Sequence, residues 1–251
     1  MIRIEDLYFT YLNSERGIFK INLEINRNEF IAIIGSNGSG KTTLARCLNG
    51  LIIPCKGRVL VDGLDTGDSQ EIFEIRRRVG MVFQNPDNQI VSATVEREIA
   101  FGLENIGIPT REMIMRVERM LQQFDLQKLR KKSPHYLSGG EKQRLALASV
   151  MAMEPRYLVL DEPTSLLDPR ARKEIMQTCK RMSEEMTVVL ITQFPEEALM
   201  ADRLLIMHQG NLFADDHPAA LFSRFDLMRK LGLEPPMQFK VENELHKSGL
   251  I

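Results

Sequence analysis

One segment of the chain reads Gly35-Ser36-Asn37-Gly38-Ser39-Gly40-Lys41-Thr42-Thr43, directly after the apolar residues 30–34. It fits the strand, phosphate loop and helix pattern G-x-x-x-x-G-K-[ST]. Its glycines allow a tight turn whose backbone N–H groups converge on phosphate oxygens at the start of the next helix. Lys41 adds a positive charge, and the small Thr42 hydroxyl suits Mg2+, which keeps several of its waters. A glycine-rich turn before a helix is the simpler alternative, but both flanks match, so we predict binding of a nucleoside triphosphate.

The composition is that of a globular protein with balanced charge. The 251 residues include 33 Lys and Arg against 34 Asp and Glu, a formal net charge of -1. We therefore expect no global basic field that would draw the chain to nucleic acid or to an anionic membrane. We also expect no signal peptide, and no apolar run approaches the roughly 18 to 20 residues that cross a bilayer. A role at a membrane would require docking to another protein.

The order of strand and helix patterns predicts an α/β protein with a P-loop NTPase core. Residues 21–25 alternate between apolar and polar, which indicates an antiparallel β subdomain at the N-terminus. The apolar residues 158–160 and the segment 187–192 suit strands of a sheet that is buried on both faces. Residues 204–207 and 211–213 predict a terminal hairpin that turns at Gln209-Gly210.

Helical patterns interrupt this core and follow it. Residues 94–106 and 111–124 have helical periodicity and predict an α-helical subdomain inserted into the core. The last residues predict a short helical extension, which is too small to bury a core of its own. The predicted ranges are a nucleotide-binding domain at 1–217 with its insertion at about 84–153, and an extension at 218–251 with helices at 221–231 and 238–247.

Two positions near predicted strand ends are candidate ligand contacts. Gln84 opens a polar turn after the predicted strand 79–83. Its carbonyl could bind Mg2+ and its amide an attacking water, although a surface turn explains this residue taken alone. Tyr11 lies between the first two predicted strands, where its ring could pack in the core or stack on a purine.

A second segment with an anion-binding character reads Leu137-Ser138-Gly139-Gly140-Glu141-Lys142-Gln143-Arg144, before a helical run. Ser138 can cap this helix and leave the backbone N–H groups of Gly139 and Gly140 facing an anion at the positive helix end. An ordinary helix cap is the alternative, which the length of the motif disfavours.

Two adjacent carboxylates, Asp161 and Glu162, end the predicted strand 157–161. Parallel sheets bind ligands at this end of their strands. Strand alternation points neighbouring side chains in different directions, so Asp161 can orient Mg2+ while Glu162 polarises an attacking water. A solvated acidic turn is the less favoured alternative.

The order of these motifs resembles that of the ATP-binding cassette (ABC) ATPases, over almost the whole chain. The match includes Tyr11, the phosphate loop, Gln84, the motif at 137–141 and the residues Leu158-Val159-Leu160-Asp161-Glu162-Pro163-Thr164 and Leu166-Leu167-Asp168. Within that family, residues 44–51, 61–66, 82–89 and 231–236 resemble the energy-coupling factor (ECF) group, whose members are the ATPases of vitamin, cobalt and nickel importers.

The resemblance implies head-to-tail dimers, in which ATP on the phosphate loop of one subunit is closed over by the signature motif of another. It implies ATP and Mg2+ as ligands, with Glu162 as base and Gln84 and Gln193 as further catalytic residues. Implied metal ligands are Thr42, Gln84 and Asp161. Implied nucleotide contacts are Tyr11, Gly35, Asn37, Gly38, Ser39, Gly40, Lys41, Thr42 and Thr43, with Ser138, Gly139 and Gly140 from the signature.

Gln193 departs from the family pattern, which usually has a histidine after the strand 188–192. A glutamine amide can donate one hydrogen bond to a γ-phosphate oxygen, but it cannot become cationic as imidazole can. We therefore expect a site that binds ATP well and hydrolyses it slowly. A heterodimer would tolerate this departure, because the intact signature of this chain could complete the site of its partner.

The resemblance also implies partners and a location. We expect a second ABC ATPase subunit, identical or different, together with a transmembrane coupling protein and a substrate-binding membrane component, and no nucleic acid. The location would be the cytoplasmic face of the cell membrane, and three unclustered cysteines, Cys47, Cys55 and Cys179, fit a reducing cytosol. Two alternatives stay open, a soluble ABC ATPase that acts on a ribosomal or nucleic-acid machine and an ATP-gated binding module that does not hydrolyse ATP.

Overall fold

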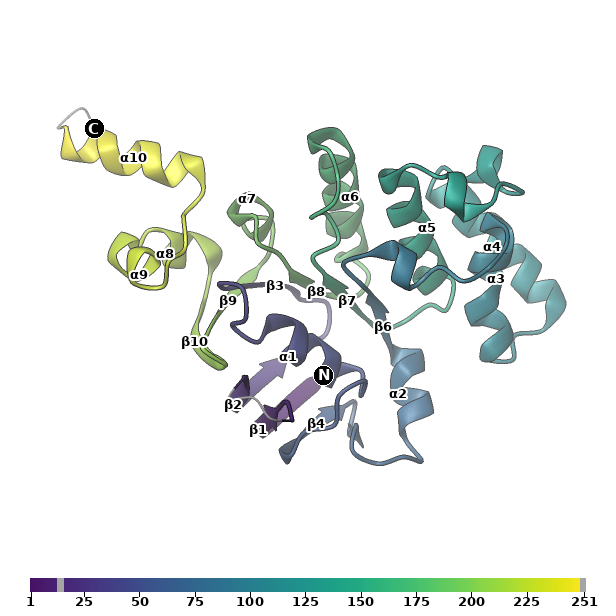
Figure 1. Cartoon of the computed structure of the whole chain (residues 1–251), viewed down its shortest axis with the longest axis horizontal. Coiled ribbons are helices and arrows are strands. Elements are labelled where there is room, and N and C mark those ends of the chain that lie inside the picture. The colour runs from purple at the N-terminus through teal and green to yellow at the C-terminus, as the bar shows by residue number, and fades with distance from the viewer. Residues whose placement is uncertain (13–15, 249–251) are drawn as a thin grey trace.

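The computed structural model describes residues 1–12 and 16–248, which form two sheets surrounded by helices (Figure 1). The first sheet is antiparallel, and in β2 exposed residues alternate with buried ones, as the pattern at residues 21–25 predicts. The antiparallel β subdomain is thus confirmed. Its strands lie in the order β2-β1-β4-β5 and are β1 (Ile2–Thr10), β2 (Gly17–Ile25), β4 (Lys56–Val61) and β5 (Leu64–Asp65).

The second sheet is mostly parallel, and four of its strands are buried along their whole length. Its order is β10-β9-β3-β8-β7-β6, in which β10 is the one antiparallel strand within the described residues. The fully buried strands are β3 (Phe30–Ile34), β6 (Val79–Val82), β7 (Tyr157–Asp161) and β8 (Thr187–Ile191), followed at the other edge by β9 (Arg203–His208) and β10 (Asn211–Asp216).

Alternate residues of the parallel strands belong to two separate hydrophobic cores. Ala32 and Leu160 pack on one face with the helices that follow β6 and β7. Ile33 and Val159 pack on the other face with the antiparallel sheet and with α1 (Lys41–Leu48). Successive side chains of a strand point to opposite faces, so a sheet covered on both faces needs apolar residues at every position. This arrangement explains the continuous apolar runs in the sequence.

The segment between β6 and β7 is helical and lies beside β6 at one end of the molecule (Figure 1). Thr94 caps its first long helix by accepting a hydrogen bond from the Arg97 N–H group. Its elements are η1 (Pro86–Asn88), α3 (Val95–Asn105), α4 (Thr110–Gln123), η2 (Gln127–Leu129), η3 (Pro134–Tyr136) and α5 (Gly139–Met151).

The single helix predicted at residues 221–231 is wrong, because two short helices stand there. The Ser223 hydroxyl donates to the Ala219 carbonyl at the end of the first, and Arg224 leaves the helical conformation with ψ of 71°. After the break at Pro235-Pro236, the last helix packs Phe239 against Phe222. Helices outside the insertion are α2 (Ile72–Arg78), α6 (Pro169–Met182), α7 (Pro195–Ala198), α8 (Pro218–Phe222), α9 (Phe225–Lys230) and α10 (Met237–Lys247).

The predicted hairpin of β9 and β10 is confirmed, and its turn contacts the phosphate loop. The Gly210 N–H donates to the Ser39 carbonyl at 3.0 Å, and the Gly210 carbonyl accepts from the Phe19 N–H at 2.8 Å. Gly210 has φ of +79°, and a Cβ atom there would lie 2.6 Å from the Gly17 carbonyl oxygen. Glycine fits this turn because any larger residue would push the two sheets apart at the phosphate loop.

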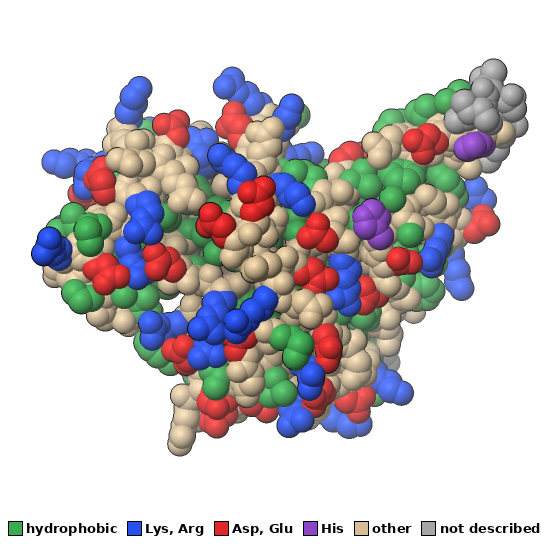
Figure 2. Space-filling model, turned by 180° about the vertical axis from the view of Figure 1, so that it is seen from behind, with side chains coloured by type: hydrophobic (Ala, Val, Ile, Leu, Met, Phe, Trp, Pro, Cys, Tyr) green, Lys and Arg blue, Asp and Glu red, His purple; other side chains and the backbone are tan. Residues whose placement is uncertain are grey.

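Basic and acidic side chains are interspersed over the face seen in Figure 2, without a field of one sign. Many charged side chains of the described residues form ion pairs, as Arg130 does with Glu96 at 2.7 Å and Arg203 does with Asp215 at 2.5 Å. Among the described residues, the structure contains no helix with the length and hydropathy that a membrane crossing needs.

Candidate functional site

The phosphate loop joins β3 to α1 and lines a cavity of about 500 Å³. Gly40 occupies the N-cap position of α1 with φ of +104°, a conformation that favours glycine. The first N–H groups of a helix have no partner within it, so this end of α1 can bind an anion. Residues that line the cavity are Tyr11, Arg16, Gly17, Asn37, Gly38, Ser39, Gly40, Lys41, Thr42, Thr43, Gln84, Glu162 and Gln193.

Lys41 is a buried cation at the base of this cavity, with 5% of its surface exposed. Its ammonium donates to the carbonyls of Gly35 at 2.8 Å and Ser36 at 3.1 Å. Burial lowers the pKa of Lys41, while the charges of Glu162 and Asp161 act in the opposite direction. Neutral carbonyls hold the side chain in place without neutralising it, so its charge can act on a phosphate.

Ser39 presents a buried hydroxyl for which the described residues provide no hydrogen-bond partner. An unpaired buried hydroxyl is costly unless a ligand satisfies it. The space around it leaves no room for a larger neighbour, since a Cβ atom at Gly35 would lie 2.5 Å from the Ser39 oxygen. Gly35 thus lies behind the loop, and its lack of a side chain allows the close packing of the loop on β9.

Two polar pairs involve the carboxylates at the end of β7, and they join β7 to the helix end of the phosphate loop and to the segment after β6. The Thr42 hydroxyl donates to the Asp161 carboxylate at 3.0 Å, and burial raises the pKa of Asp161 while this hydrogen bond lowers it. The Gln84 amide donates to the Glu162 carboxylate, also at 3.0 Å. The structure therefore gives the two adjacent carboxylates different partners, in agreement with the alternation expected of a strand.

Glu162 has an unusual backbone conformation, with φ of +49° just after β7. A residue with a side chain adopts this left-handed region at a cost of about 1 kcal/mol or more, and such residues cluster at functional sites. Burial raises the pKa of the Glu162 carboxyl, and the charge of Lys41 opposes that effect. A carboxylate with a raised pKa in a polar cavity is suited to general base catalysis.

Tyr11 is not a core residue, since 40% of its surface is exposed. Its ring stands edge-on to Phe9, and its hydroxyl lies 3.0 Å from the Thr43 hydroxyl. One wall of the cavity is therefore an aromatic ring on which a base could stack. Arg16 and Gly17 line the same wall, and the sequence offered no motif that would identify them.

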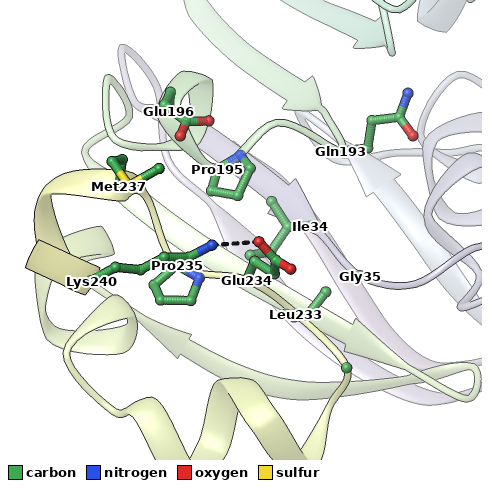
Figure 3. Close-up of a pocket in the computed structure, with 11 residues that line it drawn as sticks. Ile34, Gly35, Gln193, Pro195, Glu196, Leu233, Glu234, Pro235, Met237 and Lys240 are labelled. Carbon is green, nitrogen blue, oxygen red and sulfur yellow. Dashed lines mark hydrogen bonds and ion pairs between the residues drawn. The ribbon is translucent and has the colours of Figure 1, made fainter.

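Gln193 follows β8 and lines two cavities at once. The second cavity, about 460 Å³, lies between the core and the C-terminal extension. Figure 3 shows Gln193 at the far end of this cavity from Met237 and Lys240, which belong to α10, where Lys240 pairs with Glu234. Gln193, which is predicted to contact the γ-phosphate, thus also lines the cavity between the core and the C-terminal extension.

The signature residues are not part of the phosphate-loop cavity. Ser138 caps α5 in a capping box, accepting from the Glu141 N–H while the Glu141 carboxylate accepts from the Ser138 N–H at 2.7 Å. Ser138, Gly139 and Gly140 line a separate cavity of about 300 Å³. Sequence reasoning did not identify four other residues that line it, which are Arg144, Arg170, Ala171 and Glu174, although Arg144 lies in the quoted motif.

Comparison with known proteins identifies the class. The family model described as ABC transporter matches residues 18–165, which include the phosphate loop, the signature and both carboxylates. The chain therefore belongs to the ABC transporter family.

Individual relatives narrow this assignment. The energy-coupling factor transporter ATP-binding protein EcfA1 of Clostridium perfringens is 43% identical over 257 aligned residues, which cover all of this chain and 92% of that protein. The structure of cbiO1 from Clostridium perfringens, part of the ABC transporter complex cbiONQ, superposes with a TM-score of 0.82 and 34% identity, covering 96% of this chain and 98% of that one. Within the ABC family, the chain thus belongs with the energy-coupling factor ATP-binding proteins.

A third relative shows the cassette as a dimer. The ATP-binding cassette MJ0796, solved in a post-hydrolysis state bound to ADP and Pi, superposes with a TM-score of 0.78 and 30% identity, covering 87% of this chain and 99% of that one. The resemblance drawn from the sequence motifs and the α/β fold class are both confirmed.

Replacing Ser39 by Ala should separate ligand binding from stability. The unpaired hydroxyl contributes little to the folded state without ligand, so we expect an unchanged or higher melting temperature. ATP affinity should fall about fivefold to tenfold, which corresponds to about 1 kcal/mol for one lost hydrogen bond. Calorimetric titration with ATP and thermal unfolding measure the two effects, with Ser36→Ala, an exposed neighbour, as control. Equal ATP affinity in the two variants would contradict this interpretation.

Proposed function

We propose that this chain is the ATP-binding and ATP-hydrolysing subunit of an ECF-type importer and that it acts within a head-to-tail dimer. The observation that supports this proposal is the presence of two anion-binding helix ends, at Gly40 and Ser138, which line separate cavities. A second ABC ATPase subunit, identical or different, would place its signature over the phosphate loop of this one. Each nucleotide would then contact both subunits.

Different residues around the phosphate loop would contact different parts of the nucleotide. Tyr11 would stack on adenine, and Ser138, Gly139 and Gly140 of the opposing subunit would bind the γ-phosphate. Thr42, Gln84 and Asp161 are an all-oxygen donor set, which suits Mg2+, and the bound ion would neutralise phosphate charge. The phosphates would lie against Asn37, Gly38, Ser39, Gly40, Lys41, Thr42 and Thr43, while Gly35, which does not line this cavity, would allow the loop to pack closely on β9.

Hydrolysis would depend on Glu162 as general base, with Gln84 holding its carboxylate through the amide hydrogen bond. Gln193 would donate one hydrogen bond to the γ-phosphate, and Lys41 would stabilise its charge. Release of phosphate removes contacts that exist only in the closed dimer, so the pair opens. That opening would move the proteins docked on the dimer.

Replacing Glu162 by Gln tests both the dimer and the base. The amide keeps the shape of the side chain but cannot accept a proton, so we expect ATP to trap a dimer while turnover falls at least a hundredfold. Size-exclusion chromatography with ATP and phosphate release measure the two effects. A second variant, Glu162→Gln with Ser138→Arg, fills the signature cavity and should return the trapped species to the size of the separate subunits. A nonhydrolysing variant that stays monomeric in ATP would refute the dimer, and unchanged turnover would favour the ATP-gated binding module.

Replacing Gln193 by His tests why this site should be slow. An imidazole can carry charge beside the γ-phosphate, and regaining that assistance should be worth about 1 to 3 kcal/mol, or one to two powers of ten in turnover. Steady-state phosphate release from the purified dimer measures this effect, with Gln193→Ala as a control that should fall below the natural chain. Unchanged or reduced turnover in Gln193→His would count against the hypothesis.

The surface for the membrane partner is a groove of about 500 Å³ between α2, β6, α3 and α5. Its lining is mostly apolar and includes Phe73, Phe83, Phe101 and Met153, of which Phe73 and Phe101 are substantially exposed. Exposed apolar side chains around a groove are typical of a protein interface. We propose that a helix of the transmembrane coupling protein docks here, next to Gln84, so that docking and nucleotide state are connected.

This docking would determine where the chain is located and which transport process its ATP hydrolysis drives. The chain would be a peripheral protein on the cytoplasmic face of the membrane, and a substrate-binding membrane component would select a vitamin or a transition-metal ion. Residues 1–217 would be the ATPase domain, with the helical subdomain inserted at about 84–153. In the extension at 218–251, Met237 and Val241 are exposed and four residues apart on α10, so they form one face that suits contact with the second subunit.

Replacing Phe101 by Asp should detach the membrane components. A charge at the centre of an apolar contact must be desolvated, which costs several kcal/mol on binding. Co-purification from detergent-solubilised membranes, with identification of the attached proteins, measures the loss. The control Ile114→Asp introduces the same charge on α4, at a side chain that is 59% exposed against 45% for Phe101 and does not line the groove. Equal recovery of membrane components with both variants would contradict the assignment of the groove.

A further inference from the structure

Glu197 is a buried carboxylate that the nucleotide cavity does not use. It lies on the short helix α7, with 4% of its surface exposed. Burial raises the pKa of Glu197, and its hydrogen bonds together with Arg172 oppose that effect. A buried carboxylate is a poor source of stability, because desolvation offsets most of what its partners contribute. Stability therefore does not explain why a carboxylate stands at this position, and its hydrogen-bond partners suggest a different role.

Its two oxygens bind two loops of the site. The Thr164 hydroxyl donates to one oxygen at 2.6 Å, and the Thr192 hydroxyl donates to the other at 2.5 Å. Thr164 stands two residues after Glu162, and Thr192 directly precedes Gln193. Charge-assisted hydrogen bonds of this length fix direction as well as distance. One side chain thus joins the loop of the general base to the loop of the γ-phosphate contact.

Arg172 adds a third segment to this network. Its guanidinium lies 3.8 Å from the Glu197 carboxylate, stacks at 3.7 Å on the ring of Phe194 and donates to the Leu167 carbonyl at 3.5 Å. Leu167 lines the signature cavity, so the network reaches from both catalytic loops to the half-site that serves the other subunit.

We infer that Glu197 is a positioning residue of the ATPase reaction, which holds the loops of Glu162 and Gln193 in fixed register on either side of the γ-phosphate. This inference rests on the proposed roles of those two residues. Glu197 itself is buried and does not line the nucleotide cavity. It acts by keeping base and phosphate contact at the spacing that the transition state requires, where small displacements cost large factors in rate.

The test is steady-state ATP hydrolysis by the complex purified with its partners. Glu197→Gln keeps the volume but removes the negative charge and replaces one acceptor oxygen by an amide donor. Both hydrogen bonds then lose their charge assistance, and one threonine hydroxyl must turn from donor to acceptor. We expect kcat to fall at least tenfold while KM for ATP stays within about twofold, because the phosphate loop is untouched. The control Glu196→Gln changes an exposed carboxylate on the same helix and should leave both constants within about twofold.

Threonine variants separate positioning from folding, even if Glu197→Gln folds poorly. Thr164→Val should lower kcat alone, and Thr164→Ser, which restores the hydroxyl, should recover most of it. Within the described residues the Thr164 hydroxyl forms a hydrogen bond with Glu197 only, whereas the Thr192 hydroxyl also accepts one from the Phe194 N–H group. The Thr164 variants therefore test the contact with Glu197 more directly than the Thr192 variant does. Thr192→Val should behave in the same way, and the double valine variant should be no slower than the slower single one, because either change alone already breaks the connection between the loops.

Three results would overturn the inference. They are an unchanged kcat in Glu197→Gln or Thr164→Val, a rise in KM that accounts for the loss, and valine effects that multiply in the double variant. A natural chain that does not hydrolyse ATP would instead refute the proposed function itself, so the two failures can be told apart.

Discussion

Four parallel strands end along one edge of a buried sheet, and the chemistry of this chain depends on that alignment. The phosphate loop follows β3, Gln193 follows β8 and Gln84 follows β6, while Asp161 ends β7 and Glu162 comes directly after it. These strands are neighbours in space in the order β3-β8-β7-β6, although long segments separate them in sequence. Apolar side chains fill most positions of the buried strands, so most of the polar groups gather where the strands stop. Packing on both faces of the sheet therefore fixes the relative positions of the polar groups.

Much of the fold could be predicted because its signals are local. The alternation at residues 21–25, the apolar strands and the Gln209-Gly210 turn each depend on neighbouring residues, and the structure confirms them. The prediction of one helix at 221–231 was wrong because the spacing of apolar residues carries no information about helix ends. Here the Ser223 hydroxyl donates to the Ala219 carbonyl at the end of α8.

The site was predictable to the extent that its residues sit in motifs. The phosphate loop, the signature and the paired carboxylates have fixed spacings. The structure brings the phosphate loop and Glu162 together in one cavity, and Asp161 accepts a hydrogen bond from Thr42 of the loop. The catalytic roles of these residues remain predictions. Glu197 could not be found in this way, because its partner Thr164 is 33 residues away and the contact exists only in the folded chain. Arg16 is similar, since it lies in no motif and its place beside the cavity exists only in the folded chain.

Separate half-sites make the nucleotide part of a protein interface. A single subunit offers a helix end and a cation on one surface and a capped helix end on another, and neither cavity contains the groups of the other. A ligand can shift an equilibrium only by its difference in affinity between two states. ATP that contacts both subunits binds the closed dimer more tightly than the open one. Loss of the γ-phosphate removes this difference in affinity. The same architecture allows one of two sites to be weak, as we propose for the site that contains Gln193, while the pair still closes.

The turn at Gly210 constrains how this protein can be modified. Hairpin tips are usually the segments that accept an inserted peptide or a new pair of termini. Here the backbone of Gly210 forms hydrogen bonds both with Ser39 in the phosphate loop and with Phe19 in the other sheet, so the hairpin tip holds these two parts of the structure together. A tag or fluorescent domain placed there would disturb nucleotide binding.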